Sequence, residues 1–414
     1  MEQTEIQEKK PSALGIFLDE VQKSPLTLTF LAILTGIILG GLLAAITSLE
    51  MYAAFKVSFW EGIKTGLNIA WSTYSALFTG SVGNFGDMSD ALASGDALAI
   101  RRAFNPFFES LVQSTPFIFG GLAVAFGFRV GLFNIGAEGQ IFVGAMSSVW
   151  AGYTFTNLPP ILHIPLALLF GAAGGALWGF IPGFLKAKTG AHEVINTIMM
   201  NYIAFRLSDY MLRGPLKDPN EFTPKSPWIA DSAKLLRIFE DPIRFHIGFF
   251  IALGIAYLIY WILFKTTWGF ELRTVGANPH AAKYAGMSNV LATIAAMSVS
   301  GALAGLAGAN EILGVNYRLV PAFSSGYGFD AIALALLGKN HPFGVVLSAL
   351  LFGFLRNGAR QMQLKAGIPI DIISILQALI MAFIAAPAII RTIYRLKEPE
   401  VEEEALQISG WGGK

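Results

Sequence analysis

The 414-residue sequence contains no cysteine, and only 14% of its residues are charged. The absence of cysteine excludes disulfide scaffolds, thiolate metal sites and cysteine nucleophiles. Soluble globular chains carry about 25% charged residues, so the low charge argues against a cytosolic enzyme or a disordered regulator. Because the net charge is only +1 and no basic face is visible, the sequence does not indicate a nucleic-acid binder either.

Hydrophobic residues, in contrast, make up 54% of the chain, and the mean hydropathy is +0.56. A soluble fold could not bury this much apolar surface, so most of it must face lipid or other buried helices. The 44 glycines suit helices that pack closely inside a bilayer. The composition therefore predicts a polytopic membrane protein.

Ten apolar stretches with few or no charges are candidate membrane spans, since about 20 apolar residues cross a bilayer as a helix. They are residues 26–49, 110–128, 140–155, 164–185, 194–212, 247–264, 289–313, 331–337, 342–355 and 372–390. The short pair 331–337 and 342–355 can instead form a broken or re-entrant hairpin. We therefore predict an all-α fold with about ten transmembrane helices, some broken or re-entrant near the centre.

Lysine and arginine in short loops indicate the orientation, because such loops are usually cytoplasmic. If the ten spans alternate, one side receives Lys186, Lys188, Lys265, Arg273, Lys283, Lys339, Arg391, Arg395 and Lys397. This places both termini in the cytoplasm. Residues 1–25 are then a cytoplasmic N-terminal segment, 26–397 a transmembrane domain, and 398–414 a cytoplasmic tail.

Two polar stretches of that domain, residues 50–109 and 213–244, fall on the extracytoplasmic side. Within the first, residues 51–80 are aromatic and only partly apolar, so we predict an amphipathic helix on the outer face rather than a further span. Glycines recur every four residues in three of the apolar stretches: Gly171, Gly175, Gly179 and Gly183, then Gly36 and Gly40, and Gly301 and Gly305. This spacing favours close helix packing over a ligand role.

Polar side chains at membrane depth are costly and are often functional. The first cluster lies in residues 129–140, where glycines break the helix and Asn134, Glu138 and Gln140 supply donors and acceptors. Broken helices at this depth are tolerated where the freed backbone is buried or lines a cavity, and they often mark a transport path. The alternative is a tight interhelical turn with a structural carboxylate paired to Arg129.

The second cluster lies in residues 190–202, where Glu193, Asn196 and Met200 share one face of a helix. His192 and Glu193 have no second histidine at ligand spacing, so no metal site is predicted. A cap at the membrane edge is the alternative for Glu193, whereas the amides of Asn196 and Asn201 are harder to explain as packing.

The third cluster contains Asn310, Glu311, Asn316 and Arg318, followed by a glycine-broken stretch at 324–330. Its order loosely repeats that of residues 129–140, which predicts a pair of broken helices with a site at their interface. The predicted substrate-path residues are Phe133, Asn134, Glu138, Gln140, Glu193, Asn196, Asn201, Asn310, Glu311, Tyr327 and Asp330.

Residues 265–288 connect two spans on the cytoplasmic side. Asn278 can cap a short helix that Pro279 begins, and Gly286 would end it about one and a half turns later. From the residues alone, this segment is either an interaction site for a partner or an ordinary connector.

Four blocks of the chain together resemble one known family. They are residues 131–140 (GLFNIGAEGQ), 192–202 (HEVINTIMMNY), 275–286 (VGANPHAAKYAG) and 326–338 (GYGFDAIALALLG). The sequence is similar, over roughly residues 25–395, to permease subunits of bacterial ABC importers for nucleosides and simple sugars. These belong to the ribose and branched-chain amino acid permease superfamily. The long 50–109 insertion departs from the family pattern.

The resemblance implies a multi-pass protein of the bacterial plasma (inner) membrane that works with three partners. These are an ABC ATPase subunit, a second permease subunit, homologous or identical, and an extracytoplasmic substrate-binding protein. It also implies that the 276–286 segment is a coupling helix that docks into the ATPase. The coupling residues would be Gly276, Ala277, Asn278, Pro279, Ala281, Ala282, Tyr284 and Gly286.

The sequence contains no Gly-x-x-x-x-Gly-Lys-Ser/Thr phosphate loop. We therefore expect no cofactor on this chain and ATP use by a partner subunit. A path lined mostly by uncharged polar groups suits a small polar solute such as a nucleoside or simple sugar. One alternative is an ion-coupled secondary transporter, with Glu138, Glu193, Glu311 and Asp330 as cation-site candidates. The other is an intramembrane enzyme, but none of the five histidines lies beside a convincing nucleophile, so a non-enzyme is predicted.

Overall fold

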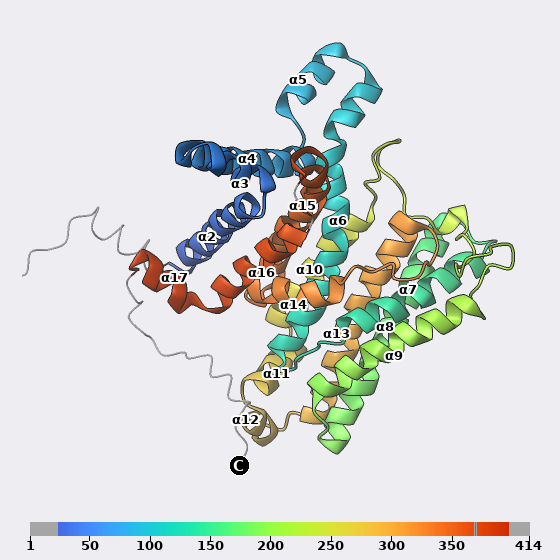
Figure 1. Ribbon diagram of the computed structural model, residues 1–414. Helices are drawn as coiled ribbons and strands as arrows, with labels where there is room; N and C mark the ends of the chain where they lie inside the picture. The colour runs from blue at the N-terminus through green and yellow to red at the C-terminus, as the bar shows by residue number, and fades with distance from the viewer. Residues whose placement is uncertain (1–23, 368, 370, 397–414) are drawn as a thin grey trace, which may run out of the picture.

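The computed structural model describes residues 24–367, 369 and 371–396 (Figure 1). Within these ranges the regular elements are helices, and one isolated bridge joins Arg237 to His246. The all-α prediction is therefore confirmed for this part of the chain. Nearly all of the predicted N-terminal segment 1–25, Lys397 and the whole tail 398–414 lie outside the described residues.

The long helices form one bundle. In chain order the helices are α2 (Pro25–Ile46), α3 (Leu49–Val57), α4 (Phe59–Ser81), α5 (Phe85–Ser94), α6 (Ala97–Arg129), α7 (Ala137–Thr154), α8 (Pro160–Thr189), α9 (Glu193–Arg213), η1 (Asp231–Ala233), α10 (Gly248–Lys265), α11 (Thr267–Ala277), α12 (Pro279–Tyr284), α13 (Asn289–Glu311), η2 (Ile312–Asn316), α14 (Tyr327–Leu337), α15 (Pro342–Ala366), α16 (Asp371–Ala385) and α17 (Pro387–Tyr394). Figure 1 shows α12 at one end of the bundle and α5 at the opposite end.

Six helices among the described residues are long and apolar enough to cross a membrane, namely α2, α6, α8, α10, α13 continued by η2, and α15. A seventh is added if α16 and α17, which are bent by 85°, form one span. Three predicted spans fall on helices that do not meet these criteria, α7, α9 and α14. The described structure is thus a multi-pass arrangement of at least six apolar helices.

Helices α7, α9 and α14 fail the criteria for a membrane-spanning helix for three different physical reasons. Helix α7 is buried along most of its length and packs against α8 and α13, so it needs little lipid-facing apolar surface. Helix α9 carries charged residues at both ends. Helix α14 has 11 residues and is therefore about 16 Å long, roughly half of a bilayer core. A length of this kind fits the broken or re-entrant alternative for residues 331–337.

The centre of the bundle is α13, which packs against α6, α7 and α8. Close helix packing at the repeated glycines was predicted from the sequence, and the structure shows that they bring α8 and α13 backbone to backbone. A Cβ atom added at Gly175 would lie only 2.7 Å from Cα of Gly305. Close packing, rather than a ligand role, therefore explains these glycines.

The 50–109 insertion folds into α3, α4, α5 and the first turns of α6. The prediction of a single amphipathic helix over 51–80 is wrong in one respect, because the extended backbone of Ser58 divides α3 from α4. One face of α4 packs on α2, α3 and α15. The opposite face exposes Trp60, Leu67, Trp71 and Phe78. Figure 1 shows α3 and α4 projecting sideways from α6.

Candidate functional site

The α6–α7 connection is a tight break whose polar side chains bond to one another. Asn134 is buried; its Nδ2 donates to Oε1 of Gln140 and to Oγ of Ser300, both at 2.8 Å, and its Oδ1 accepts the N–H of Gly136. The ring of Phe133 stacks on Phe128 at 5.2 Å. The amides predicted for the substrate path therefore hold the shape of this break in the described conformation.

Glu138 joins the two broken regions that the sequence singled out. Its side chain is almost fully buried, and its carboxylate accepts the hydroxyl of Ser324 at 2.6 Å and the N–H of Gly328 at 2.5 Å. The positive N-terminal end of α14 thus points at a carboxylate on the first turn of α7. The structure therefore brings residues 129–140 and 324–330 together. Among the described residues, Glu138 and Arg129 form no ion pair with each other. Arg129 donates instead to the carbonyls of Lys339 and Asn340.

The second cluster divides between the break and the α8–α9 turn. Asn201 fastens α9 to the break, because its Oδ1 accepts the N–H of Gly139 and its Nδ2 donates to the carbonyl of Ile135. Glu193 forms an ion pair with Lys186 at 2.5 Å. Burial alone would raise the pKa of Glu193, but the hydrogen bond and charge of Lys186 outweigh it and lower that pKa. Nδ2 of Asn196 is buried and has no hydrogen-bond partner among the described residues.

The third cluster also divides. Both polar atoms of the Asn310 side chain are buried, and neither has a hydrogen-bond partner in the described part of the chain. The carboxylate of Glu311 accepts a hydrogen bond of 3.2 Å from Nδ2 of Asn316, across the π-helical segment η2. Such segments are frequent at functional sites. Arg318 pairs with Glu221 at 2.8 Å and therefore belongs to the loop before α10 rather than to the path.

Asp330 and Tyr327, on the first turn of α14, meet an arginine that the sequence interpretation missed. Arg356 of α15 lies 3.3 Å from the Asp330 carboxylate, and its guanidinium carbon lies 4.9 Å from the ring centre of Tyr327. The predicted span 342–355 ends one residue before Arg356, which is not among the predicted site residues. The signal was present in the next residues, which contain no helix breaker until Gly358 and run on in α15 to Ala366.

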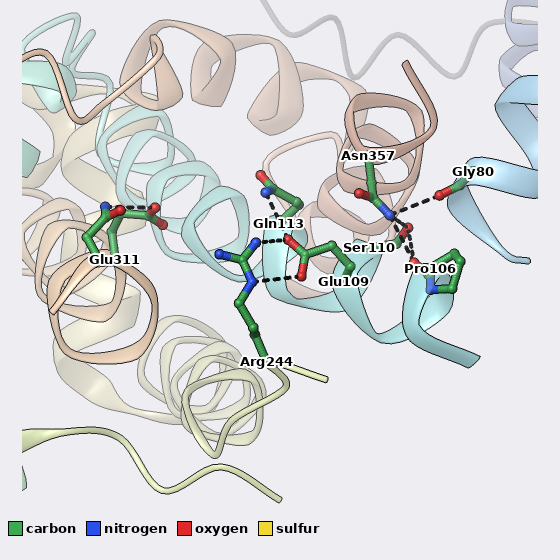
Figure 2. Close-up of polar contacts among 9 residues, drawn as sticks. Gly80, Pro106, Glu109, Ser110, Gln113, Arg244, Glu311 and Asn357 are labelled. Atoms are coloured by element: carbon green, nitrogen blue, oxygen red, sulfur yellow. Dashed lines mark hydrogen bonds and ion pairs between the residues drawn. The ribbon is translucent and has the colours of Figure 1, made fainter. Parts of the chain in front are cut away.

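A second polar group, also missed, joins the insertion to the bundle. Figure 2 shows Arg244, from the segment before α10, reaching the carboxylate of Glu109 on α6. Next to them, Nδ2 of Asn357 donates to the carbonyls of Gly80 and Pro106 and to Oγ of Ser110. Glu109, Arg244, Asn357, Gly80 and Pro106 line part of a cavity of about 260 Å³. Burial would lower the pKa of Arg244, but Glu109 outweighs it and raises that pKa.

The 265–288 segment folds as its capping residues predict. Oδ1 of Asn278 accepts the N–H groups of His280 and Ala281, Pro279 begins α12, and Gly286 follows with a positive φ of 81°. Tyr284 is 97% exposed, whereas the predicted coupling residue Ala282 is 0% exposed and faces the protein. The other predicted coupling residues, Gly276, Ala277, Asn278, Pro279, Ala281 and Gly286, are exposed or half-buried.

This segment also contacts the α6–α7 break. A Cβ atom at Gly276 would lie 2.8 Å from the carbonyl carbon of Val130 and 2.9 Å from the nitrogen of Gly131. The backbone that leads into α12 therefore rests directly on the backbone that begins the break.

Residues 107–385 match the family of branched-chain amino acid transport system permease components. The chain is 48% identical to the guanosine ABC transporter permease protein NupP of Bacillus subtilis (strain 168), over 69% of this chain and 82% of that protein. It is 40% identical to the nucleoside ABC transporter permease protein NupB of Lactococcus lactis subsp. cremoris (69% and 80% covered). It is 36% identical to the glucose ABC transporter permease protein TsgB13 of Haloferax volcanii (67% and 75% covered). No solved structure was found to match.

Proposed function

Because this chain belongs to the family of branched-chain amino acid transport permease components, we propose that it forms one transmembrane half of an importer for a nucleoside or simple sugar. It is a permease subunit of an ABC importer, and its named relatives are transport proteins rather than enzymes. The observation that carries the proposal is the family match, which extends from α6 to the end of α16. Hydrolysis of ATP is assigned to a separate subunit.

In the proposed topology the chain crosses the plasma membrane of a bacterium ten times and has cytoplasmic termini. Helix α14, together with the irregular chain before it, makes a broken pass, and α7 and α9 make passes inside the bundle. Support comes from the basic loops, which fall on one side under this alternation. Since the chain is free of cysteine, the variants Ser94→Cys and Ser288→Cys test it directly. An impermeant thiol reagent should label the first only from outside and the second only from inside.

The proposed path runs along the interface between the α6–α7 break and the N-terminal end of α14. The side chains of Asn134, Glu138 and Asn201, which now bond to neighbouring protein groups, would exchange those bonds for bonds to the solute as the helices tilt. Phe133, Gln140, Asn196, Asn310, Glu311, Tyr327 and Asp330 complete the proposed set. Glu193 is better assigned to the α8–α9 turn, because Lys186 neutralises it there.

In the proposed coupling, α12 docks into the ATPase subunit. The exposed side chain of Tyr284 supplies the contact, and the buried methyl group of Ala282 anchors the helix to the bundle. ATP binding in the partner would push α12, and the Gly276–Gly131 contact would pass the motion to the break. A second permease subunit and an extracytoplasmic substrate-binding protein complete the proposed assembly.

The proposal is tested by uptake of a labelled nucleoside into cells that express this chain with its ATPase and binding-protein partners. Uptake should vanish when the phosphate-loop lysine of the ATPase is replaced, and it should persist for minutes after an ionophore collapses proton and sodium gradients. Uptake that survives loss of the ATPase and stops with the gradients would overturn it in favour of an ion-coupled secondary transporter.

A further inference from the structure

A cavity of about 310 Å³ lies between α14, α15 and α16, and its lining mixes charge, amide and aromatic groups. Asp330 and Phe329 come from α14, Arg356 from α15 and Gln377 from α16. Ser325 stands at one edge, while Phe352 and Met381 supply apolar wall. The volume lies near the lower end of the roughly 300–1,000 Å³ range of small-molecule sites.

The ion pair of Asp330 and Arg356 is held in place but remains partly exposed to the cavity. Arg356 donates to the carbonyl of Ser325 at 3.0 Å and to its hydroxyl, and its guanidinium carbon lies 5.4 Å from the ring centre of Phe117. These contacts hold the guanidinium in one plane beside Asp330. The side chains of Asp330 and Arg356 keep 37% and 25% exposure, so a solute in the cavity can reach both.

The ion pair between Asp330 and Arg356 lies at an energetically unfavourable position. Arg356 lies within the apolar candidate span Pro342–Leu364, and ionisable groups inside membrane helices are expensive and mark solute pathways. The contacts of Arg356 with the rings of Phe117 and Tyr327 and with the Ser325 carbonyl would be enough to hold α15 in place. The carboxylate beside the guanidinium instead presents hydrogen-bond acceptors next to donors on the cavity wall.

The cavity also offers a flat apolar face. Phe329 follows the glycine-rich start of α14 and is 47% exposed, so its ring has no full partner within the described chain. Aromatic rings stack on planar ligands, and base-on-ring stacking contributes about 1–3 kcal/mol. The hydroxyl of Ser374 and the amide of Gln377, on the α16 wall, can bond to further hydroxyl groups.

We propose, on the basis of the permease function above, that this cavity binds the base of a purine nucleoside, with guanosine preferred over a simple sugar. The base stacks on Phe329, its adjacent N–H donors bond to the Asp330 carboxylate, and its carbonyl accepts from Arg356. Ser374 and Gln377 take the ribose hydroxyls. Guanine carries adjacent N–H donors beside a carbonyl on one edge, whereas adenine does not.

The test measures ATP-driven uptake of labelled guanosine and adenosine by the complete complex in proteoliposomes with its binding protein. Asp330→Asn should raise KM for guanosine about 5- to 150-fold, the value of one bidentate base contact, and change KM for adenosine less than threefold. Asp209→Asn, which alters a surface ion pair on α9, is the matched control and should change neither. Ribose and glucose should not compete with guanosine.

A second variant covers the case in which Asp330→Asn does not assemble. Phe329→Leu keeps the apolar volume but removes the flat ring, so KM should rise severalfold for both nucleosides with unchanged protein yield. An unchanged guanosine-to-adenosine ratio in Asp330→Asn, or unchanged KM values in Phe329→Leu, would overturn the proposed site while leaving the permease function intact. A wild-type complex that imports glucose but no nucleoside would overturn the substrate class. Absence of any ATP-driven uptake would overturn the permease function itself.

Discussion

Replacing Gly175 with alanine tests whether the centre of the bundle depends on backbone contact between α8 and α13. The added Cβ atom would lie 2.7 Å from Cα and 2.8 Å from the nitrogen of Gly305, and closer still to the carbonyl oxygen of Gly301. Non-bonded carbon atoms pack at about 3.5–4.0 Å, so the two helices must separate by about 1 Å. Backbone atoms cannot rotate aside as a flexible side chain can.

Overpacking in a close-packed interior costs about 1–3 kcal/mol. We expect the upper half of this range, about 2–3 kcal/mol, because the clash involves backbone on both helices. The free energy of unfolding should fall accordingly, which corresponds to a loss of about 30- to 150-fold in the folding equilibrium constant. The increments should not add independently in a Gly175→Ala/Gly305→Ala double variant, since one separation of the helices relieves both clashes.

Gly254 of α10 is the matched control, because a Cβ atom added there would have no heavy atom within 4 Å. Gly254→Ala should be neutral, or stabilising by up to about 1 kcal/mol through helix propensity. The measurement is reversible unfolding by sodium dodecyl sulfate in mixed micelles, followed by circular dichroism. If Gly175→Ala unfolds at the same detergent fraction as the wild type and Gly254→Ala, the close α8–α13 contact is refuted.

Three further predictions concern the ends of the bundle. Tyr284→Ala should lower ATP-driven uptake at least tenfold without loss of protein, because only the exposed face of α12 changes. The neighbouring control Lys283→Gln should retain most uptake. Normal uptake in Tyr284→Ala would contradict the coupling role. Glu109→Gln should destabilise the protein by about 1–3 kcal/mol in detergent unfolding, because it leaves the partly exposed Arg244 without its counterion; adding Arg244→Gln should restore part of the loss, and additive losses would contradict direct pairing. Burial, with Arg237 and Arg244 nearby, lowers the pKa of His246 from 6.5 to about 4, so the unfolded chain takes up the proton first as pH falls. The contribution of His246 to the free energy of unfolding should be complete above pH 6.5 and decline by up to about 1.4 kcal/mol per pH unit towards pH 4. His246→Gln should flatten this part of the curve of unfolding free energy against pH. An unchanged slope in the variant would refute the assignment.

Local chemistry made some features predictable from the sequence. The start of α12 follows from the side chain of Asn278 and the ring of Pro279, which act within one turn. Apolar length likewise predicts α6, α8 and α13, and the four-residue spacing of glycines predicts that each of α8 and α13 packs closely on another helix, without indicating which one. Each of these depends on residues that are neighbours along one helix.

Features that depend on contacts between distant segments were not predictable in the same way. The partners of Glu138 lie on a segment almost 190 positions away, and nothing near residue 138 indicates them. Ala282 was expected to face a partner, yet a single turn of helix has too few residues for a hydrophobic pattern to show its inward side. Arg356 was missed because a charged residue was taken as the end of a span, although α15 continues through it.

We expect this chain to move a solute only when a partner subunit hydrolyses ATP. The most direct measurement is uptake of labelled guanosine into proteoliposomes that hold the purified complex, with ATP supplied on the ATPase side and no ion gradient. We predict uptake against a concentration gradient that requires ATP hydrolysis, the ATPase subunit and the binding protein together. Accumulation by this chain alone, driven by a proton or sodium gradient, would contradict the claim.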